Sequence, residues 1–312
     1  MNALFIVIGL FLLIIGGNWL LKAAVGFSVV LKIPKIVIGM TVVSFATSLP
    51  ELIVSVKSAL NGHADLALGN VMGSNIANLG LVLAIIILIS TIKIEKGFYI
   101  TDWPVMIFSS ILFYIFIAFD GILQRYEGII LVSFLVIFLI FLLKFQKPAV
   151  VEESIEDDEE VPLYKDVLFL AIGGVALWGG SELLIDGAIG IATKFNVSER
   201  IIGITIISVG TSIPELAASV IAVLKKEKAI SLGNLIGSNV FNILAVLGIT
   251  SIITPIKVVD QGLLTNDIFW MLGISFLILP LIFVPVKMKL SWKEGVILLF
   301  LYVTFIYRML IH

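Results

Sequence analysis

The chain has 312 residues, of which 60% are hydrophobic and only 13% are charged. Soluble globular proteins average about 45–50% apolar residues, so this composition indicates an integral membrane protein and excludes an ordinary soluble domain. A net charge of −2 gives no reason to expect a nucleic-acid partner, and a sequence without cysteine excludes disulfides and thiolate metal sites.

Ten apolar runs follow one another along the chain, each close to the length of about 20 residues that spans the hydrocarbon core of a bilayer. The first has no basic segment before it and no clear cleavage site after it, so we interpret it as a retained transmembrane helix. Most lysine and arginine residues fall in loops on one side, which predicts a cell-membrane protein with both termini outside. The ten runs lie near 3–21, 36–60, 66–91, 103–119, 128–144, 167–186, 201–224, 230–253, 266–286 and 295–310.

Two motifs occur twice, with the same spacing between them each time. The sequence T-S-L-P-E at 47–51 returns as T-S-I-P-E at 211–215. The sequence G-N-V-M-G-S-N-I-A-N at 69–78 returns as G-N-L-I-G-S-N-V-F-N at 233–242. Such a repeat indicates that the chain contains two copies of one structural unit.

The two copies are residues 1–144 and 167–312, and each contains five of the predicted helices. Because five is odd, the second copy must enter the membrane from the opposite side, as in many secondary transporters. We therefore predict an all-α integral membrane protein of ten transmembrane helices, arranged as two inverted-topology five-helix repeats. Residues 145–166, rich in aspartate and glutamate, are interpreted as an extended cytoplasmic linker, although a cation-sensing role is the alternative.

The repeated proline predicts a break in the second helix of each copy. Pro50 cannot donate a backbone hydrogen bond, and its ring clashes with the carbonyl group one turn earlier. Backbone carbonyls freed in a membrane need another partner, and a bound cation is one such partner. The polar residues around the two breaks are spaced so that they share one helix face: Ser44, Thr47, Ser48 and Glu51 in the first copy, and Ser208, Thr211, Ser212 and Glu215 in the second.

The third helix of each copy adds a polar stripe of amides and hydroxyls. Its members are Asn70, Ser74 and Asn78 in the first copy, and Asn234, Ser238 and Asn242 in the second. We expect Asn78 and Asn242 to be ligands, whereas Asn70, Asn75, Asn234 and Asn239 fit better as hydrogen-bonding contacts between helices. The glycine pairs in the same segments let a neighbouring backbone come close.

A buried glutamate in hydrocarbon is costly, so two glutamates at matching places need an explanation. A lone copy could be a structural kink with a protonated glutamate, but the repetition favours a site. Oxygen ligands without histidine or cysteine suit hard cations such as Ca²⁺ and Na⁺. One Ca²⁺, or two or three Na⁺, could occupy the same oxygens, and protons could replace both.

The paired motifs resemble the α-repeats of the Na⁺/Ca²⁺ exchangers, in the prokaryotic ten-helix form of the cation/Ca²⁺ antiporter superfamily. The resemblance implies a Ca²⁺ site formed by Glu51, Glu215 and the carbonyls of Thr47 and Thr211. It also implies Na⁺ sites that use Ser48, Ser74, Ser212 and Ser238, with carbonyls at Ser44 and Ser208. It further implies that the first and sixth helices, near 3–21 and 167–186, slide against the other eight.

One position divides the family. The K⁺-dependent branch, and some archaeal members, carry aspartate where this chain has Asn242, and the matching Asn78 is neutral as well. The sequence therefore favours a K⁺-independent Na⁺/Ca²⁺ antiporter, expected to be a monomer in the lipid bilayer, with H⁺/Ca²⁺ exchange ranked second. A passive cation channel is a further alternative. An enzyme with a resident metal or other cofactor is not expected, because His63 and His312 both fall outside the predicted helical core.

Overall fold

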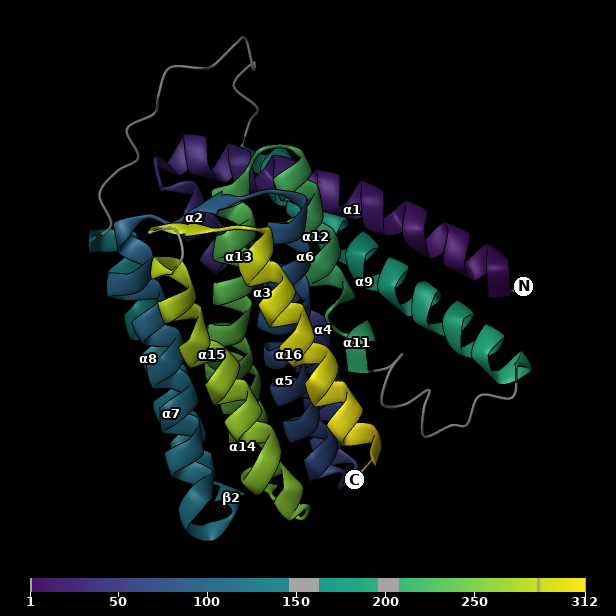
Figure 1. Ribbon diagram of the computed structural model, residues 1–312, viewed down its shortest axis with the longest axis vertical. Coiled ribbons are helices and arrows are strands. Elements are labelled where there is room, and N and C mark those ends of the chain that lie inside the picture. The colour runs from purple at the N-terminus through teal and green to yellow at the C-terminus, as the bar shows by residue number, and fades with distance from the viewer. Residues whose placement is uncertain (1, 146–162, 196–207, 285–286, 312) are drawn as a thin grey trace.

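The computed structural model describes residues 2–145, 163–195, 208–284 and 287–311. These residues are almost entirely helical, with four two-residue strands among them (Figure 1). Most of the predicted linker at 145–166 and the first part of the predicted helix at 201–224 lie outside the described residues.

The first half of the chain is built from short and long helical segments in series. Its elements are α1 (Asn2–Leu31), α2 (Lys35–Ile38), the π-helix η1 (Gly39–Val43), α3 (Ser44–Thr47), α4 (Leu49–Leu60), α5 (Ala64–Ala77), the π-helix η2 (Asn78–Val82), α6 (Leu83–Ile89), β1 (Ile92–Lys93), the π-helix η3 (Phe98–Asp102), α7 (Trp103–Asp120), β2 (Ile122–Leu123) and α8 (Arg125–Phe145).

The second half follows the same order wherever it is described. Its elements are α9 (Leu163–Lys194), α11 (Ser208–Gly210), α12 (Ile213–Leu224), α13 (Lys228–Phe241), the π-helix η5 (Asn242–Leu247), α14 (Gly248–Ile253), β3 (Ile256–Lys257), the π-helix η6 (Leu263–Asp267), α15 (Ile268–Phe283), β4 (Lys289–Leu290) and α16 (Trp292–Ile311).

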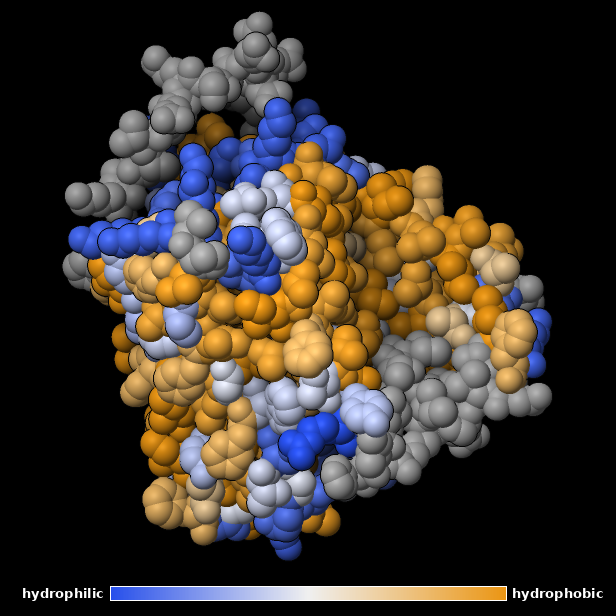
Figure 2. Space-filling model, in the orientation of Figure 1, coloured by the Kyte–Doolittle hydropathy of each residue, from blue (hydrophilic) through white to orange (hydrophobic). Residues whose placement is uncertain are grey.

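Among the described helices, seven are long and apolar enough to cross a membrane. The pair Lys35–Thr47 and Leu49–Leu60 would be an eighth span, bent by 44°. The bend falls at Ser48, two residues before Pro50, so the predicted helix break is confirmed. Apolar side chains cover most of the visible flank, and polar ones gather near its ends (Figure 2).

Helices α1 and α9 lie side by side across one edge of the bundle and run antiparallel (Figure 1). Both are longer than the sequence predicts. Helix α1 continues past Leu21 and buries Ala23, Ala24 and Phe27, and α9 extends from Leu163 to Lys194. Their backbones touch at glycine: a Cβ atom at Gly180 would lie 2.9 Å from the carbonyl oxygen of Gly9. This close packing makes α1 and α9 a single unit beside the rest of the bundle.

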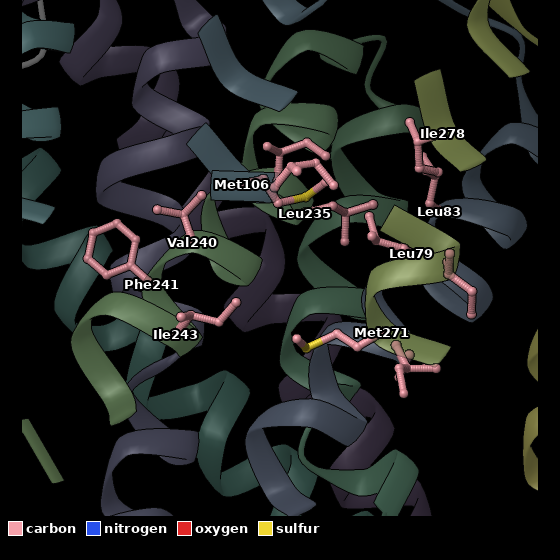
Figure 3. Packing of buried hydrophobic residues seen from close by; sticks show 14 of the residues in the cluster. Leu79, Leu83, Met106, Leu235, Val240, Phe241, Ile243, Met271 and Ile278 are labelled. Atoms are coloured by element: carbon pink, nitrogen blue, oxygen red, sulfur yellow. The ribbon is translucent and has the colours of Figure 1, made fainter. Parts of the chain in front are cut away.

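Two continuous spans occupy the centre of the bundle. In the span Ala64–Ile89, 72% of the most apolar stretch is buried, and in Lys228–Ile253 it is 83%, against 22–39% in the other five spans. Figure 3 shows Leu79 and Leu83 from the first span and Leu235, Val240 and Ile243 from the second within the same hydrophobic cluster. Lipid therefore surrounds the outer helices, and the two central spans contact mainly protein.

Each two-stranded sheet joins one half of the chain to the other. β1 pairs antiparallel with β4, so that Ile92 lies opposite Leu290, and β2 pairs antiparallel with β3, so that Leu123 lies opposite Ile256. The strands are too short to add much stability by themselves. They fix how the ends of the helices in the two halves are aligned.

The contact between α1 and α9 gives a direct test of the fold. A Cβ atom at Gly180 would lie 2.9 Å from the Gly9 oxygen and 3.0 Å from the Leu13 nitrogen, and neither backbone atom can rotate away. At the neighbouring Gly179, it would meet no described atom within 4 Å. We expect Gly180→Ala to lower the free energy of unfolding by about 1–3 kcal/mol, as overpacking does elsewhere.

Thermal unfolding of the purified protein in detergent measures this difference. Gly179→Ala is the matched control, and it should leave the melting temperature unchanged or raise it slightly, since alanine favours the helix over glycine. Equal melting temperatures for the two variants would contradict the close packing of α1 against α9.

Candidate cation site

Two glutamates lie fully buried at the two helix breaks. Glu51 is in the first turn of α4 and Glu215 is in the first turn of α12, where the positive end of the helix dipole favours a carboxylate. The two carboxylates are close enough to repel each other. None of their four oxygens has a hydrogen-bond partner among the described residues. A charge so placed is strongly destabilising unless a cation or proton compensates for it.

Hydroxyl groups from both halves lie beside the Glu215 carboxylate. Thr47, Ser48 and Ser238 lie beside the Glu215 carboxylate, although within the described chain none meets it in hydrogen-bond geometry. The hydroxyl of Ser48, like that of Ser212, is buried without a partner in the same part of the chain. Because these hydroxyl and carboxylate oxygens have no other partner, they are free to coordinate a cation directly.

The helix breaks of each half contact the central helix of the other half. Thr47 Oγ1 lies 3.3 Å from Ser238 Oγ, and at the matching place Ser74 Oγ lies 3.2 Å from Thr211 Oγ1. Thr47 also donates to the side-chain oxygen of Asn234 at 3.2 Å. The site is therefore assembled between the halves, and each half alone would hold only part of it.

The ligands expected from the third helices are also at the centre. Asn78 and Asn242 are fully buried, and each begins a π-helical turn, η2 and η5 respectively. Each donates a hydrogen bond from its side-chain nitrogen, while its side-chain oxygen has no partner among the described residues. π-Helical turns are often found at functional sites, and nothing in the sequence indicated them here.

The remaining predicted ligands are Ser44 and Ser208. The Ser44 hydroxyl lies 2.8 Å from the carbonyl oxygen of Gly39 and 2.9 Å from that of Asn234, and its single hydrogen can be donated to either, which ties η1 and α3 to α13. The Ser44 carbonyl accepts a bond from Ser48 N at 2.9 Å. Ser208 begins α11, but its side chain lies outside the described part of the chain.

Asn70 and Asn234 act between helices, as expected. Asn70 donates to Ser55 Oγ at 3.0 Å, and Asn234 donates to Ser219 Oγ at 3.1 Å. The predicted close approach at the second glycine pair is confirmed, because a Cβ atom at Gly237 would lie 2.5 Å from Met40 Cα. The segment that would match η1 in the second half lies outside the described residues.

Glu127 and Glu294 hold matching places near the ends of the two halves, and each is followed by glycine. In the structure, Glu127 accepts a bond from Gln124 N at 2.8 Å, and Glu294 accepts one from Ser291 N at 2.6 Å. These glutamates therefore cap the starts of α8 and α16. Glu182 is exposed on α9. Neither capping glutamate is needed to explain the cation site.

The charge of the site follows from its composition. In the described residues, no group of three or more His, Cys, Asp or Glu side chains is placed to hold a metal ion. The charge therefore comes from Glu51 and Glu215 alone, and the other oxygens are neutral hydroxyls, amides and carbonyls. Two carboxylates with neutral oxygens around them fit Ca²⁺, which takes six to eight oxygen ligands, and equally fit Na⁺.

Comparisons with known proteins agree with this geometry. The protein family described as "Sodium/calcium exchanger protein" matches residues 1–144 and 165–311. The chain is 36% identical to "Putative antiporter CaxA" of Alkalimonas amylolytica over 97% of each chain. It is 29% identical to "Sodium/calcium exchanger MaX1" of Methanosarcina acetivorans, over 98% of this chain and 97% of the relative.

A solved structure is similar over nearly the whole length. It is the sodium-calcium exchanger NCX_Mj soaked with Na⁺ and Ca²⁺, with a TM-score of 0.83 and 27% sequence identity. The similarity covers 98% of this chain and 97% of that one. At this identity and coverage, the two chains share a fold and not merely a class of secondary structure.

The unpaired carboxylates predict an unusual response to neutralisation. In buffer without Ca²⁺ and Na⁺, Glu51→Gln should melt at a higher temperature than the wild type, because the repulsion between Glu51 and Glu215 is removed. Saturating Ca²⁺ should raise the wild-type melting temperature by mass action, equivalent to about 2.7 kcal/mol at 100 times Kd, and should not raise that of the variant.

Glu294→Gln is the control, since Glu294 is equally buried but its carboxylate caps α16. This variant should melt at a lower temperature and keep the response to Ca²⁺. A full Ca²⁺ response in Glu51→Gln would show that Glu51 is not part of the site.

Proposed function

Because the chain belongs to the sodium/calcium exchanger protein family, we propose that it is a secondary-active antiporter that exchanges Na⁺ for Ca²⁺ across the cell membrane without K⁺. The observation that carries the proposal is the pair of buried carboxylates, Glu51 and Glu215, whose oxygens have no partner in the described protein. The named relatives and NCX_Mj provide independent support.

We propose ten transmembrane helices in two inverted repeats, residues 1–144 and 167–312, joined by the linker at 145–166. The matching series α5–η2–α6 and α13–η5–α14 supports the repeat. The strand pairs support the inversion: β1 and β3 hold matching places in the two halves, yet each pairs with a strand of the opposite half. Both termini are proposed to lie outside the cell, in a monomer.

The proposed Ca²⁺ site consists of the Glu51 and Glu215 carboxylates with the carbonyls of Thr47 and Thr211. Na⁺ would bind beside it, to the hydroxyls of the surrounding serines and the oxygens of the two ligand asparagines, with carbonyls at Ser44 and Ser208. These further Na⁺ ligands are Ser48, Ser74, Ser212, Ser238, Asn78 and Asn242. No other cofactor is proposed.

Exchange follows from the cost of the bare carboxylates. Two buried negative charges without a counter-ion are destabilised by several kcal/mol, so an unloaded site is disfavoured in any closed state. Ca²⁺ and Na⁺ compete for the same two charges, so one must leave before the other binds. The change between the state open to one side of the membrane and the state open to the other is then possible only with a cation bound at the site.

The moving part is proposed to be α1 with α9. These helices pack tightly on each other through glycine, with backbone against backbone, whereas their contacts with the bundle are made largely by apolar side chains and by the Ser181 hydroxyl, which donates to Gly210 O at 2.9 Å. Gly17 faces the Ile221 side chain of α12, and Gly174 faces the Ala46 Cβ at 3.9 Å. Side chains of this kind can change partners while the pair slides, which would open the site to each side in turn.

The coupling ion can be identified by transport in proteoliposomes. Proteoliposomes loaded with Na⁺ and diluted into buffer free of Na⁺ and K⁺ should take up Ca²⁺, and uptake should stop when the Na⁺ gradient is collapsed. Glu215→Gln should abolish uptake in a protein that still folds. Uptake that follows a pH gradient without Na⁺ would replace Na⁺ by H⁺, and Ca²⁺ flow without any counter-gradient would indicate a channel.

The charge of the site can be tested by adding a carboxylate to it. Asn242→Asp adds a third buried carboxylate, so one Ca²⁺ no longer neutralises the site. We expect Ca²⁺ uptake by this variant to slow in K⁺-free buffer and to recover when K⁺ is added, whereas wild-type uptake should not respond to K⁺. A K⁺ requirement in the wild type would contradict the proposed K⁺ independence.

A further inference from the structure

Four asparagines form a closed hydrogen-bonded group between the two central helices. Asn75 donates to the backbone oxygen of Asn239, and Asn239 donates to the backbone oxygen of Asn75, both at 3.3 Å. Asn78 donates to the side-chain oxygen of Asn239, and Asn242 donates to the side-chain oxygen of Asn75, both at 3.1 Å. Every one of these bonds runs from one half of the chain to the other.

The orientation of all four amides follows from the two backbone oxygens. A backbone carbonyl can only accept, so the side-chain nitrogens of Asn75 and Asn239 must face the carbonyls they contact. Their side-chain oxygens then point the other way and accept from Asn242 and Asn78. The nitrogens of Asn78 and Asn242 are thereby used, and their oxygens are the atoms left without a partner.

Two methionines reinforce this orientation. The side-chain nitrogen of Asn75 lies 3.7 Å from the sulfur of Met271, and that of Asn239 lies 3.8 Å from the sulfur of Met106. A thioether sulfur is a weak acceptor, so it favours the nitrogen of an amide over its oxygen. With either amide reversed, its oxygen would face both a carbonyl oxygen and a sulfur.

From this arrangement we propose that Asn75 and Asn239 are positioning residues for the cation site. Asn239 sets the amide of Asn78, and Asn75 sets the amide of Asn242, so that both ligand oxygens are directed to the ions. Neither positioning residue need touch a cation. The proposal rests on the proposed function, because it assumes that Asn78 and Asn242 bind the transported ions.

The crossed arrangement distinguishes positioning from general packing. A ligand in one half is held by an asparagine of the other half, and all four side chains are buried. If Asn239 acts through Asn78, its loss should matter only while Asn78 is present. If Asn239 merely stabilises the core, its effect should be independent of Asn78.

A double-mutant cycle on cation binding tests this inference. The probe is Na⁺ or Ca²⁺ binding to the purified full chain, measured by calorimetry. We expect Asn239→Ala to weaken binding by about tenfold, the lower end of the effect seen when the orienting partner of a metal ligand is removed. Asn78→Ala should then weaken binding little further in the Asn239→Ala background. By contrast, the fold-losses of affinity caused by Asn239→Ala and by Asn242→Ala should multiply in the double variant.

A near-isosteric variant gives a second readout. Because a charged carboxylate would face the Asn75 carbonyl, the buried side chain of Asn239→Asp is expected to be protonated. It then donates to that carbonyl and still accepts from the Asn78 amide, so Asn78→Ala should again weaken binding by its full factor in that background. Loss of the Asn78 effect with Ala and its return with Asp is a pattern that a structural role would not produce. Ser110→Ala is the control, because this buried hydroxyl bonds only within its own helix among the described contacts, to Met106 O at 3.0 Å, and it should leave binding unchanged.

The remaining outcomes separate the two proposals. If the wild type binds the cations but the affinity losses of Asn78→Ala and Asn239→Ala multiply in the double variant, the positioning role is overturned. The proposed antiporter function is then unaffected. A folded wild type that binds neither Na⁺ nor Ca²⁺ would overturn both. Failure of both Asn75→Ala and Asn239→Ala to fold would assign these asparagines to stability and overturn the positioning role.

Discussion

The structure depends on the cost of two carboxylates held away from water. Glu51 and Glu215 are fully buried within a hydrophobic bundle, where an unpaired charge is destabilising by at least a few kcal/mol. The helix breaks at Ser48 and Ser212 put each carboxylate in the first turn of a helix, where backbone N–H groups and the helix dipole offset part of this cost. A cation would offset the rest, and this is why we propose that the two carboxylates form the binding site.

This constraint explains why the halves contact each other as they do. The hydroxyl pair Thr47–Ser238, its counterpart Ser74–Thr211, the amide group and both strand pairs all join one half to the other. The site needs a rigid frame, because neutral oxygens stabilise a cation only when they are already in place. The unit formed by α1 and α9 lies beside this frame and packs against it through apolar side chains, while its closest backbone contacts are inside the pair.

Much of this was accessible from sequence because it rests on local chemistry. Pro50 breaks its helix wherever that helix is placed, and the repeated motifs show that the same break occurs twice. The capping role of Glu294 was also accessible, because Ser291 and Glu294 have the local S-x-x-E spacing of a capping box. The π-helical turns at Asn78 and Asn242 were not accessible, because no spacing within these segments distinguishes a π-helical turn from an ordinary helical turn.

The amide group links the charge of the site to its geometry. An aspartate at 242 would bring a carboxylate oxygen towards the side-chain oxygen of Asn75, which at present accepts a bond from the Asn242 nitrogen. Two acceptors at that distance repel, and Asn75 could turn its nitrogen to the aspartate only by giving up its bond to the Asn239 carbonyl. The surroundings therefore favour an amide at this position, and with it a site of charge −2. One Ca²⁺ or two Na⁺ would balance that charge equally well, which is what the proposed exchange of one ion for the other requires.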